Sequence, residues 1–579
     1  MAKGERARMK YVAWLWRGTK GFRVNIVTRI LAGAARVVCG LLMIWLSKRF
    51  IDETILTGTQ DDILQMILLL VLTVVGTIVL RLLYFYMTAS ASVKKTNSLR
   101  LFYFGTLFRR KLFDGHELHS GDVTSRLSKD IETVSASIID TLPQMAVTGI
   151  QLVGAFLLMR WFDARLAWAL LLLTPVLLVV GKLISRRLRN MTLEIREGES
   201  RIQMQVQEGV EYNAVLRSLE SENWVSERLG LKQDKLENDV MRRTRFTTVA
   251  RFVIGSAFGL GYLLAFIWGG LGLRNGTITF GVMTSFLQLV GQIQHPILTL
   301  LGMVPQLVHS TASIDRLDEL EKGVDGHSGL GRDEKSQSGM RKEMLLESPL
   351  EMRGRLGVRL DNVSFGYKGG DREIVCGFTH DFKPGSKNAV MGETGKGKTT
   401  LFRLLLGFVK PDFGRIELYT ERNDSLTAGL DAEMRGCSVA VSEATRSNFV
   451  YVPQGNTLMN GSVRYNLQLA KPDATDEEMK QVLHIACAEF VNELPDDLDC
   501  EIGERGHGLS EGQAQRIAIA RGLLRPGNIL LFDEISSSLD EATEAELYRR
   551  LFDAFPEKTM IFVTHRTAVC EMCDETVRL

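Results

Sequence analysis

Long runs of apolar residues in the first half of the chain set the strongest limit on its fold. Ile63–Leu83 and Leu166–Ile184 are nearly free of charge. A helix of about 20 mostly apolar residues is long enough to cross the hydrocarbon core of a bilayer. The sequence therefore predicts an integral membrane protein. Since 579 residues are too many for one hydrophobic core, we expect at least two domains.

Several segments before residue 310 meet this length and apolarity, and together they predict a six-span, multi-pass domain. These segments are Phe22–Leu46, Ile63–Ala89, Ile138–Met159, Leu166–Ile184, Val249–Leu273 and Ile278–Val308. Arg29 and Arg36 interrupt the first segment. His295-Pro296 predicts a bend in the last segment, because proline has no backbone N–H to donate.

The charges of the loops predict how these helices are oriented. Ile51–Asp62 has four acidic residues and no Lys or Arg, whereas Val93–Lys129 and Ser185–Arg251 are rich in both cations. Basic loops remain in the cytosol, so we expect both termini to be cytoplasmic.

Met1–Lys20 is basic and aromatic, without a signal-peptide core. Trp14 and Trp16 in it favour an interfacial helix that contacts membrane lipids.

The two basic stretches are too long and too helix-like to be simple loops. Val93–Thr133 and Ser185–Val249 have helical apolar spacing and many i,i+4 charge pairs. We expect the membrane helices to continue into the cytosol and to be joined there by short crosswise helices.

Composition then changes along the chain and predicts the domain boundaries. The segment 322–357 is rich in Gly, Ser and charged residues and has no apolar period, which is typical of a polar linker. We expect an interfacial segment at 1–21, a transmembrane domain at 22–321 and a soluble α/β domain at 358–579.

The formal net charge of +2 indicates no polyanionic partner such as nucleic acid. The seven cysteines show no disulfide framework, which favours a reduced compartment. Cys570 and Cys573 form a CxxC, but no second pair stands nearby to complete a zinc site.

One glycine-rich stretch in the second half has the spacing of a phosphate-binding loop. It follows the strand-like Asn388–Met391 and precedes the helix-like Leu401–Phe408. Its residues, all candidates to bind ATP, are Gly392, Glu393, Thr394, Gly395, Lys396, Gly397, Lys398, Thr399 and Thr400. Glycines let backbone N–H groups turn toward phosphates at a helix N-terminus. We expect Lys398 to reach the β- and γ-phosphates and the Thr399 hydroxyl to bind Mg²⁺.

A second motif places two carboxylates at the end of an apolar strand. Ile529–Phe532 is followed by Asp533 and Glu534. Ligands of open α/β sheets gather at the carboxyl ends of strands. We expect Asp533 to hold Mg²⁺ or its waters, and Glu534 to act as the general base on the attacking water.

The segment Leu509–Gln513 resembles the signature of the ABC (ATP-binding cassette) family, usually LSGGQ, with Glu511 at the third position. Other segments resemble ABC exporters: Phe104–Val134 resembles their first intracellular loop, and Phe280-Gly281 with Pro296 the start of their sixth helix. The resemblance covers residues 22–579 and implies a half-transporter, similar to bacterial multidrug exporters and lipid flippases of the inner membrane.

This resemblance implies roles for further residues. Ser510, Gly512 and Gln513 would contact the nucleotide bound by the opposite subunit of a head-to-tail dimer. Tyr367 would stack on adenine, Gln454 would contact Mg²⁺ and water, and His565 would be the switch histidine. Gly503–Gly506 and Ser538–Asp540 resemble the exporter loop and the D-loop.

Three features depart from the family pattern. Glu511 adds a negative charge beside the expected triphosphate. Arg435–Asn448 reads as a polar insertion between Lys398 and Gln454. The sequence stops at Leu579, soon after the strand that follows His565, so we expect the family's C-terminal helices to be missing or truncated.

The function implied is ATP-hydrolysis-driven export or flipping of a lipid, lipophilic or amphipathic substrate by a dimer of half-transporters. A homodimer is the first hypothesis. Glu511 leaves open a heterodimer with one degenerate ATP site, and an ATP-gated channel, a regulator or an importer remain alternatives. The transported substrate is not specified. Arg29, Arg36 and Arg81 would either face a cavity for an anionic group or snorkel toward the interface.

Overall fold

A computed structural model describes residues 10–11, 13–109, 120–162, 164–321, 350–367, 373–393, 395–420, 438–503 and 508–579. The chain divides into two compact units, one formed mainly by residues up to 320 and the other mainly by residues from 334 onward. We call them the helical unit and the α/β unit. The predicted linker at 322–349 and Thr394 of the glycine-rich loop lie outside the described residues, as do residues 504–507.

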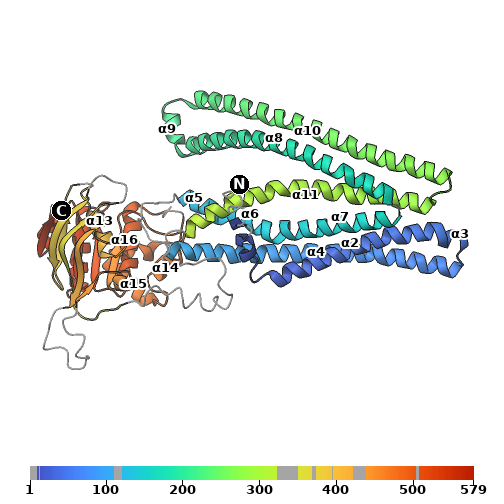
Figure 1. Ribbon diagram of the computed structural model, residues 1–579. Coiled ribbons are helices and arrows are strands. Elements are labelled where there is room, and N and C mark those ends of the chain that lie inside the picture. The colour runs from blue at the N-terminus through green and yellow to red at the C-terminus, as the bar shows by residue number, and fades with distance from the viewer. Residues whose placement is uncertain are drawn as a thin grey trace. The chain divides into compact units, whose positions relative to one another are not determined.

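Long helices build the helical unit (Figure 1). They are α2 (Arg23–Arg49), α4 (Gln60–Arg109), α7 (Leu142–Phe162), α8 (Ala164–Glu211), α10 (Glu222–Arg274) and α11 (Phe280–Glu321). Among the described residues, four stretches are long and apolar enough to cross a membrane: Arg23–Thr57, Gln60–Arg109, Gly121–Phe162 and Glu222–Arg274. A helical domain with membrane-spanning segments is thus confirmed.

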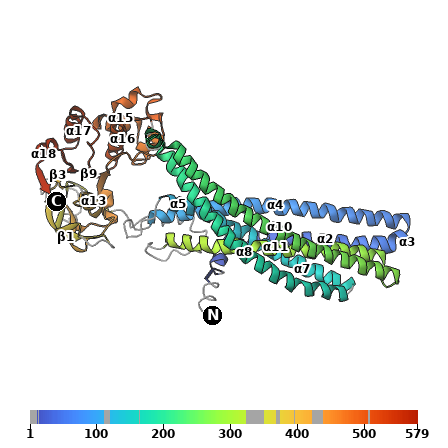
Figure 2. The ribbon, with the colours of Figure 1, turned by 90° about the horizontal axis from the view of Figure 1, so that it is seen from above.

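Several helices are far longer than a bilayer requires. The 50 residues of α4 correspond to about 75 Å at about 1.5 Å per residue, against a hydrocarbon core of about 30 Å. This length confirms the prediction that the helices continue beyond the membrane. Helices α8 and α10 lie side by side, joined by the short α9 (Asn213–Ser218) at one end of the pair (Figures 1 and 2).

Short elements connect the long helices. The turn after α2 consists of the π-helix η1 (Phe50–Thr54) and α3 (Ile55–Thr57). The approach to α7 alternates between α and π geometry, a pattern associated with functional bends. Its elements are α5 (Ser120–Ser125), η2 (Arg126–Asp130), α6 (Ile131–Ala136) and η3 (Ser137–Thr141). Helix α11 runs through Pro296 and Pro305 as one helix.

The C-terminal end of α11 is held by the N-terminal segment of the chain. The Tyr11 hydroxyl donates to Asp315 at 2.6 Å, and the Trp14 indole N–H donates to Asp318 at 3.0 Å. Trp14 is buried while Trp16 is exposed. Of these two tryptophans, only Trp16 therefore has an exposed indole ring that could contact the membrane interface.

The arginines considered for a substrate cavity differ in their surroundings. Arg29 is fully buried and donates to the carbonyl of Ile139 at 2.5 Å and to Thr88 at 3.3 Å. The Arg36 guanidinium lies over the ring of Tyr84. These contacts favour a structural role for both cations within the helical unit.

Two sheets form the α/β unit. The parallel sheet has the order β11-β3-β10-β9-β6. Its strands are β3 (Lys387–Met391), β6 (Phe449–Val452), β9 (Ile529–Asp533), β10 (Thr559–Val563) and β11 (Glu575–Arg578). The antiparallel sheet has the order β2-β1-β4-β5. Its strands are β1 (Leu356–Phe365), β2 (Val375–Phe382), β4 (Phe413–Thr420) and β5 (Ser438–Ala440). All residues of β9 and β10 are buried, as their continuous apolar runs predict.

Helices surround the parallel sheet (Figure 2). They are α13 (Lys398–Leu405), α14 (Val463–Gln468), α15 (Asp476–Ile485), α16 (Glu511–Leu523), α17 (Glu541–Ala554) and α18 (Thr567–Met572). The remaining elements are the ladder of β7 (Gly461–Ser462) with β8 (Glu501–Ile502), and the 3₁₀ turns η5 (Ala444–Asn448), η6 (Glu489–Glu493) and η7 (Asp497–Asp499).

The described part of the supposed insertion is built into this unit. It contributes β5 to the edge of the antiparallel sheet, followed by η5. Asn448 is buried, accepts from the N–H of Met352 at 2.8 Å and donates to the carbonyl of Leu350 at 2.7 Å. Residues 350–352 are thus already attached to the α/β unit, ahead of the expected boundary at 358.

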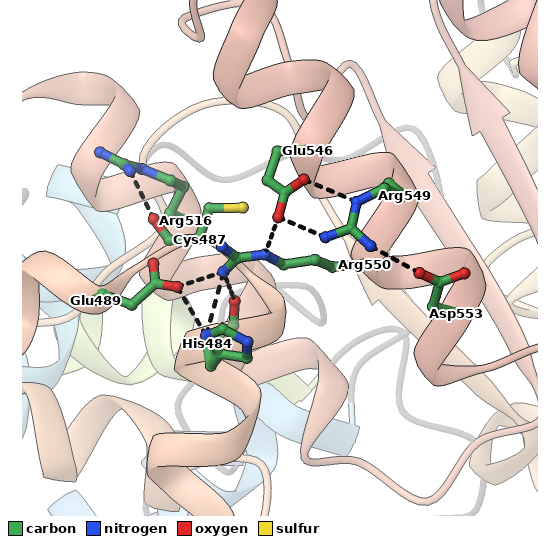
Figure 3. Close-up of polar contacts among 8 residues, drawn as sticks. All are labelled: His484, Cys487, Glu489, Arg516, Glu546, Arg549, Arg550 and Asp553. Carbon is green, nitrogen blue, oxygen red and sulfur yellow. Dashed lines mark hydrogen bonds and ion pairs between the residues drawn. The ribbon is translucent and has the colours of Figure 1, made fainter.

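A network of polar contacts joins α15, α16 and α17 (Figure 3). Arg550 of α17 donates to the carbonyl of His484 at 2.5 Å and to Glu546 at 2.6 Å. Arg516 of α16 donates to the carbonyl of Cys487 at 2.6 Å. Helices α16 and α17 are therefore both bonded to the end of α15 and the segment that follows it.

Candidate nucleotide site

The candidate site lies where the parallel strands end. Strands β3, β9 and β10 are adjacent and parallel, so their carboxyl ends meet at one edge of the sheet. Gly392 follows β3, Glu534 follows β9 and His565 follows β10. This edge is where open α/β sheets bind ligands.

The glycine-rich loop has the backbone geometry that phosphate binding requires. Gly395 and Gly397 have φ values of 86° and 93°, in the left-handed region that glycine tolerates. A Cβ at Gly397 would come within 2.7 Å of the Ile374 side chain. Gly397 is also the N-cap of α13, so the N–H groups of its first turn open toward the loop.

Lys398 begins α13 and is buried. Its Nζ donates to the carbonyl of Gly392 at 2.7 Å and lies 2.8 Å from Nε2 of His565. The ammonium group is therefore held in the loop, at the position from which it would meet a phosphate.

Asp533 is almost fully buried at the end of β9. It accepts a hydrogen bond from the Thr399 hydroxyl at 3.1 Å and another from the Tyr451 hydroxyl at 3.4 Å. Burial raises the pKa of Asp533. Sequence reasoning missed Tyr451, although an aromatic residue in a strand three positions before Gln454 is a usable signal.

The next residue, Glu534, has a φ of 48°, which is unusual for a residue with a side chain. Its Oε2 accepts from Nε2 of Gln454 at 2.7 Å, and its Oε1 lies 3.2 Å from Nε2 of His565. Glu534 thus contacts both of the other residues predicted to be catalytic.

Tyr367 lies beside the same helix. Its hydroxyl accepts from Arg403 of α13 at 2.6 Å and lies 3.4 Å from that of Thr400. Its ring packs edge-on against Phe365, with centroids 5.0 Å apart. Arg403 was missed by sequence reasoning, and it fixes the orientation of the aromatic ring expected to stack on adenine.

The signature forms the start of α16. Ser510 is the N-cap: its side chain accepts from the N–H of Gln513 at 3.2 Å, while its own N–H donates to the Gln513 side chain at 2.9 Å. This capping box occupies the Gln513 amide oxygen. Gly512 packs closely against the loop after β9. A Cβ at this position would lie 2.8 Å from the carbonyl oxygen of Ser538. Glu511 is exposed in the first turn.

Family models match both halves of the chain. The model of the ABC transporter transmembrane region matches residues 26–297, and the ABC transporter model matches residues 376–537. The chain is an ABC transporter. Its membrane region and its ATPase domain are fused in one polypeptide, and the ATPase domain binds ATP.

Relatives of this ABC transporter act on different cargoes. It is 27% identical to an ATP-dependent lipid A-core flippase of Thiobacillus denitrificans, over 98% of this chain and 92% of the relative. It is 28% identical to a fatty acid ABC transporter ATP-binding/permease protein of Mycobacterium bovis, over 80% of this chain and 68% of the relative. Its fold matches a bacterial Atm1-family ABC exporter with ATP bound, with a TM-score of 0.75 and 21% identity, over 96% and 92% of the two chains.

The oxygen ligands of the site suit Mg²⁺. The Thr399 hydroxyl and the Asp533 carboxylate are hard oxygen donors held 3.1 Å apart. Mg²⁺ is usually bound by one or two such groups together with substrate phosphates. No cluster of three His, Cys, Asp or Glu side chains suited to a metal occurs among the described residues. A site with few protein ligands, completed by ATP, fits this donor set.

Proposed function

We propose that this ABC transporter hydrolyses ATP at Glu534 to export or flip a lipid, lipophilic or amphipathic substrate across the membrane. The observation that carries this proposal is the contact of Glu534 with both Gln454 and His565, beside the loop that holds Lys398. A site that only bound ATP would not need a general base in this position.

Each residue of the site would have its own role in ATP binding or hydrolysis. Lys398, Gly392, Gly395 and Gly397 would bind the phosphates, while Tyr367 would stack on adenine. Thr399 and Asp533 would hold Mg²⁺, which neutralises phosphate charge when bound. Glu534 would take a proton from the attacking water, with Gln454 orienting its carboxylate and His565 beside it.

We propose further that two copies of the chain complete each ATP site head to tail. The hydrogen bonds described for Ser510 and Gln513 stay within the cap of α16, and none reaches Lys398, Asp533 or His565. The free N–H groups of the first turn of α16 would then contact the γ-phosphate held by the partner.

The charges near the two halves of the site favour identical partners. Glu511 is exposed in the first turn of α16, and Lys396 of the glycine-rich loop is also exposed. Among the described residues, Lys396 has only a 3.9 Å contact with Glu393, whose side chain is itself 85% exposed. In a head-to-tail dimer, Lys396 of one copy would face Glu511 of the other. Such a pair would offset the repulsion between Glu511 and the triphosphate.

A heterodimer with one degenerate ATP site is the second candidate. The observation that favours it is Glu511 itself, since a carboxylate beside the γ-phosphate disfavours closure unless a cation is near. Purified alone, such a chain would be monomeric and inactive.

For the membrane region we propose six spans in the inner membrane with both termini in the cytoplasm. The lengths of α8 and α11 support the two spans beyond the four already described. The basic stretches Val93–Lys129 and Ser185–Arg251 support the orientation. The lipid cargoes in the relatives' names support a lipidic substrate.

Reconstitution of the purified chain in nanodiscs and in vesicles tests the proposal. We expect ATPase activity that a subset of lipids or amphiphiles stimulates, and directional flux of the stimulating compound. Glu534→Gln should abolish both. Stimulated ATPase without flux would point to a regulator, and flux independent of hydrolysis would point to a channel.

A further inference from the structure

One buried side chain connects the signature helix to the end of strand β9. Gln515 lies on α16 and is fully buried. Its Nε2 donates to the backbone carbonyl of Glu534 at 3.1 Å, and its Oε1 accepts from the Ser538 hydroxyl at 2.6 Å. Both ends of the amide are used, so its orientation is fixed.

Gln515 bonds to the backbone of Glu534, which has a strained conformation. Glu534 has a φ of 48°, a conformation that costs a residue with a side chain about 1–3 kcal/mol unless its surroundings enforce it. Its N–H donates to the carbonyl of Val563 at 3.0 Å, and its carbonyl accepts from Ser537 at 3.3 Å as well as from Gln515. The hydrogen bond from Gln515 is the one that comes from another helix.

The first turn of α16 and the Gln515 amide belong to the same helix. Gly512 packs on the carbonyl of Ser538, and Gln515 lies one turn further along the same helix. An α-helix is stiff over one turn, so a shift of its N-terminus displaces the Gln515 amide relative to Glu534. A shift of the signature would therefore change the hydrogen bond from Gln515 to the backbone of Glu534.

We propose that Gln515 is a positioning residue, which sets the backbone of Glu534 according to the position of α16. The inference rests on the proposed function: in the head-to-tail dimer the signature contacts the partner's nucleotide, whereas Glu534 acts on the nucleotide of its own subunit. Nucleotide binding at one site is thereby coupled to hydrolysis at the other, through one side chain.

The test is Gln515→Met in the full chain in nanodiscs. Methionine has a similar volume and cannot donate to Glu534. We expect kcat to fall about 10- to 100-fold because the general base is misplaced. The KM for ATP should stay within about two-fold, and the Hill coefficient for ATP should fall toward about 1. Ser538→Ala, which keeps the hydrogen bond to Glu534, should lose less activity.

Two results would overturn the inference. One is a Gln515→Met protein with the kcat and Hill coefficient of the wild type. The other is a variant whose KM rises as its melting temperature falls while the Hill coefficient is kept, which is the mark of a purely structural role. Should the methionine variant not fold, Gln515→Leu provides the same comparison, because leucine also cannot donate to Glu534. Wild-type hydrolysis that is absent in Glu534→Gln shows, in the same experiment, that the proposed hydrolysis at Glu534 holds whichever result Gln515 gives.

Discussion

The ammonium nitrogen of Lys398 lies 2.8 Å from Nε2 of His565, and the same imidazole nitrogen lies 3.2 Å from the carboxylate of Glu534. One nitrogen cannot accept a proton from Lys398 and donate one to Glu534 at the same time. Phosphates that bind the Lys398 ammonium in place of His565 would release Nε2 to interact with Glu534. The geometry thus links occupancy of the phosphate site to the hydrogen bonding of Glu534, the proposed general base.

Replacing Glu534, the proposed general base, should separate ATP binding from ATP hydrolysis. Glu534→Gln keeps the shape of the side chain and removes its ability to accept a proton. We expect ATPase activity to fall by at least about 100-fold, with ATP binding retained in a fluorescent-nucleotide assay. Glu541→Gln, an exposed carboxylate at the start of α17, is the matched control and should behave as the wild type. An active Glu534→Gln protein would contradict the assigned role.

Charge reversal tests the identity of the partner. Lys396→Glu should lower ATPase activity because like charges would face each other across the dimer. Glu511→Lys alone should give a lower ATPase activity than the double variant. The double variant Lys396→Glu/Glu511→Lys should recover activity if two identical chains pair. Steady-state ATPase rates at low and high salt measure this, since screening weakens exposed pairs. Additive losses in the double variant would argue against this contact.

A methyl group at Gly512 should disturb the start of α16. Its Cβ would lie 2.8 Å from the backbone oxygen of Ser538, so either the helix or the loop must shift. We expect Gly512→Ala to lower ATPase activity and to destabilise the domain by about 1–3 kcal/mol through overpacking. Gly230→Ala in α10 has nothing within 4 Å and serves as the control, with activity unchanged. Thermal denaturation and ATPase rates measured together decide between the two effects.

Arg566 follows His565 and supports the loop after β9. It donates to the buried carboxylate of Glu544 at 2.5 Å and to the carbonyl of Leu539 at 3.1 Å. Arg566→Met would leave a buried carboxylate unpaired, at a cost of about 3 kcal/mol. Arg566→Met/Glu544→Gln should recover part of the lost stability, because no charge is then buried. A melting temperature of the single variant equal to that of the wild type would refute this reading.

The network around α17 makes stability depend on pH at the acidic end. Hydrogen bonds from Arg549 and Arg550 lower the pKa of Glu546 from 4.5 to about 2. The folded state therefore holds the proton less tightly than the unfolded chain, and this contribution to stability is complete above the unfolded pKa. It is lost as the pH falls from 4.5 toward 2. We expect the difference in melting temperature between wild type and Glu546→Gln to shrink between about pH 5 and about pH 3. A difference that stays constant over this range would show that Glu546 is not the titrating group.

Some features followed from local sequence alone. The apolar runs predict membrane helices because no other element satisfies its backbone in a bilayer, and α2, α4 and α10 are as expected. The loop from Gly392 to Lys398 is equally local, since its glycines and the helix after it are consecutive. Lys398, Asp533 and Glu534 were identified from such consecutive motifs, and their roles stay predictions.

Other features depended on contacts between distant segments. Nothing near Glu534 in the sequence indicates its positive φ, which Gln515 and Val563 enforce from another helix and strand. Tyr451 and Arg403 reach the site only because β6 lies beside β9 and α13 lies beside Tyr367. The polar stretch before Asn448 read as an insertion, because β5 has too few apolar residues to signal an edge strand.

The sequence by itself determined what kind of protein this is: a membrane region, a phosphate-binding loop and an acidic strand end each arise from neighbouring residues. Only the tertiary structure decided how the site is held. The contacts of Lys398 with His565 and of Gln515 with Glu534 join residues more than a helix apart in the chain. Periodicity and motif spacing report neighbours along the chain, whereas these hydrogen bonds depend on the packing of separate elements, and packing fixes which side chains meet.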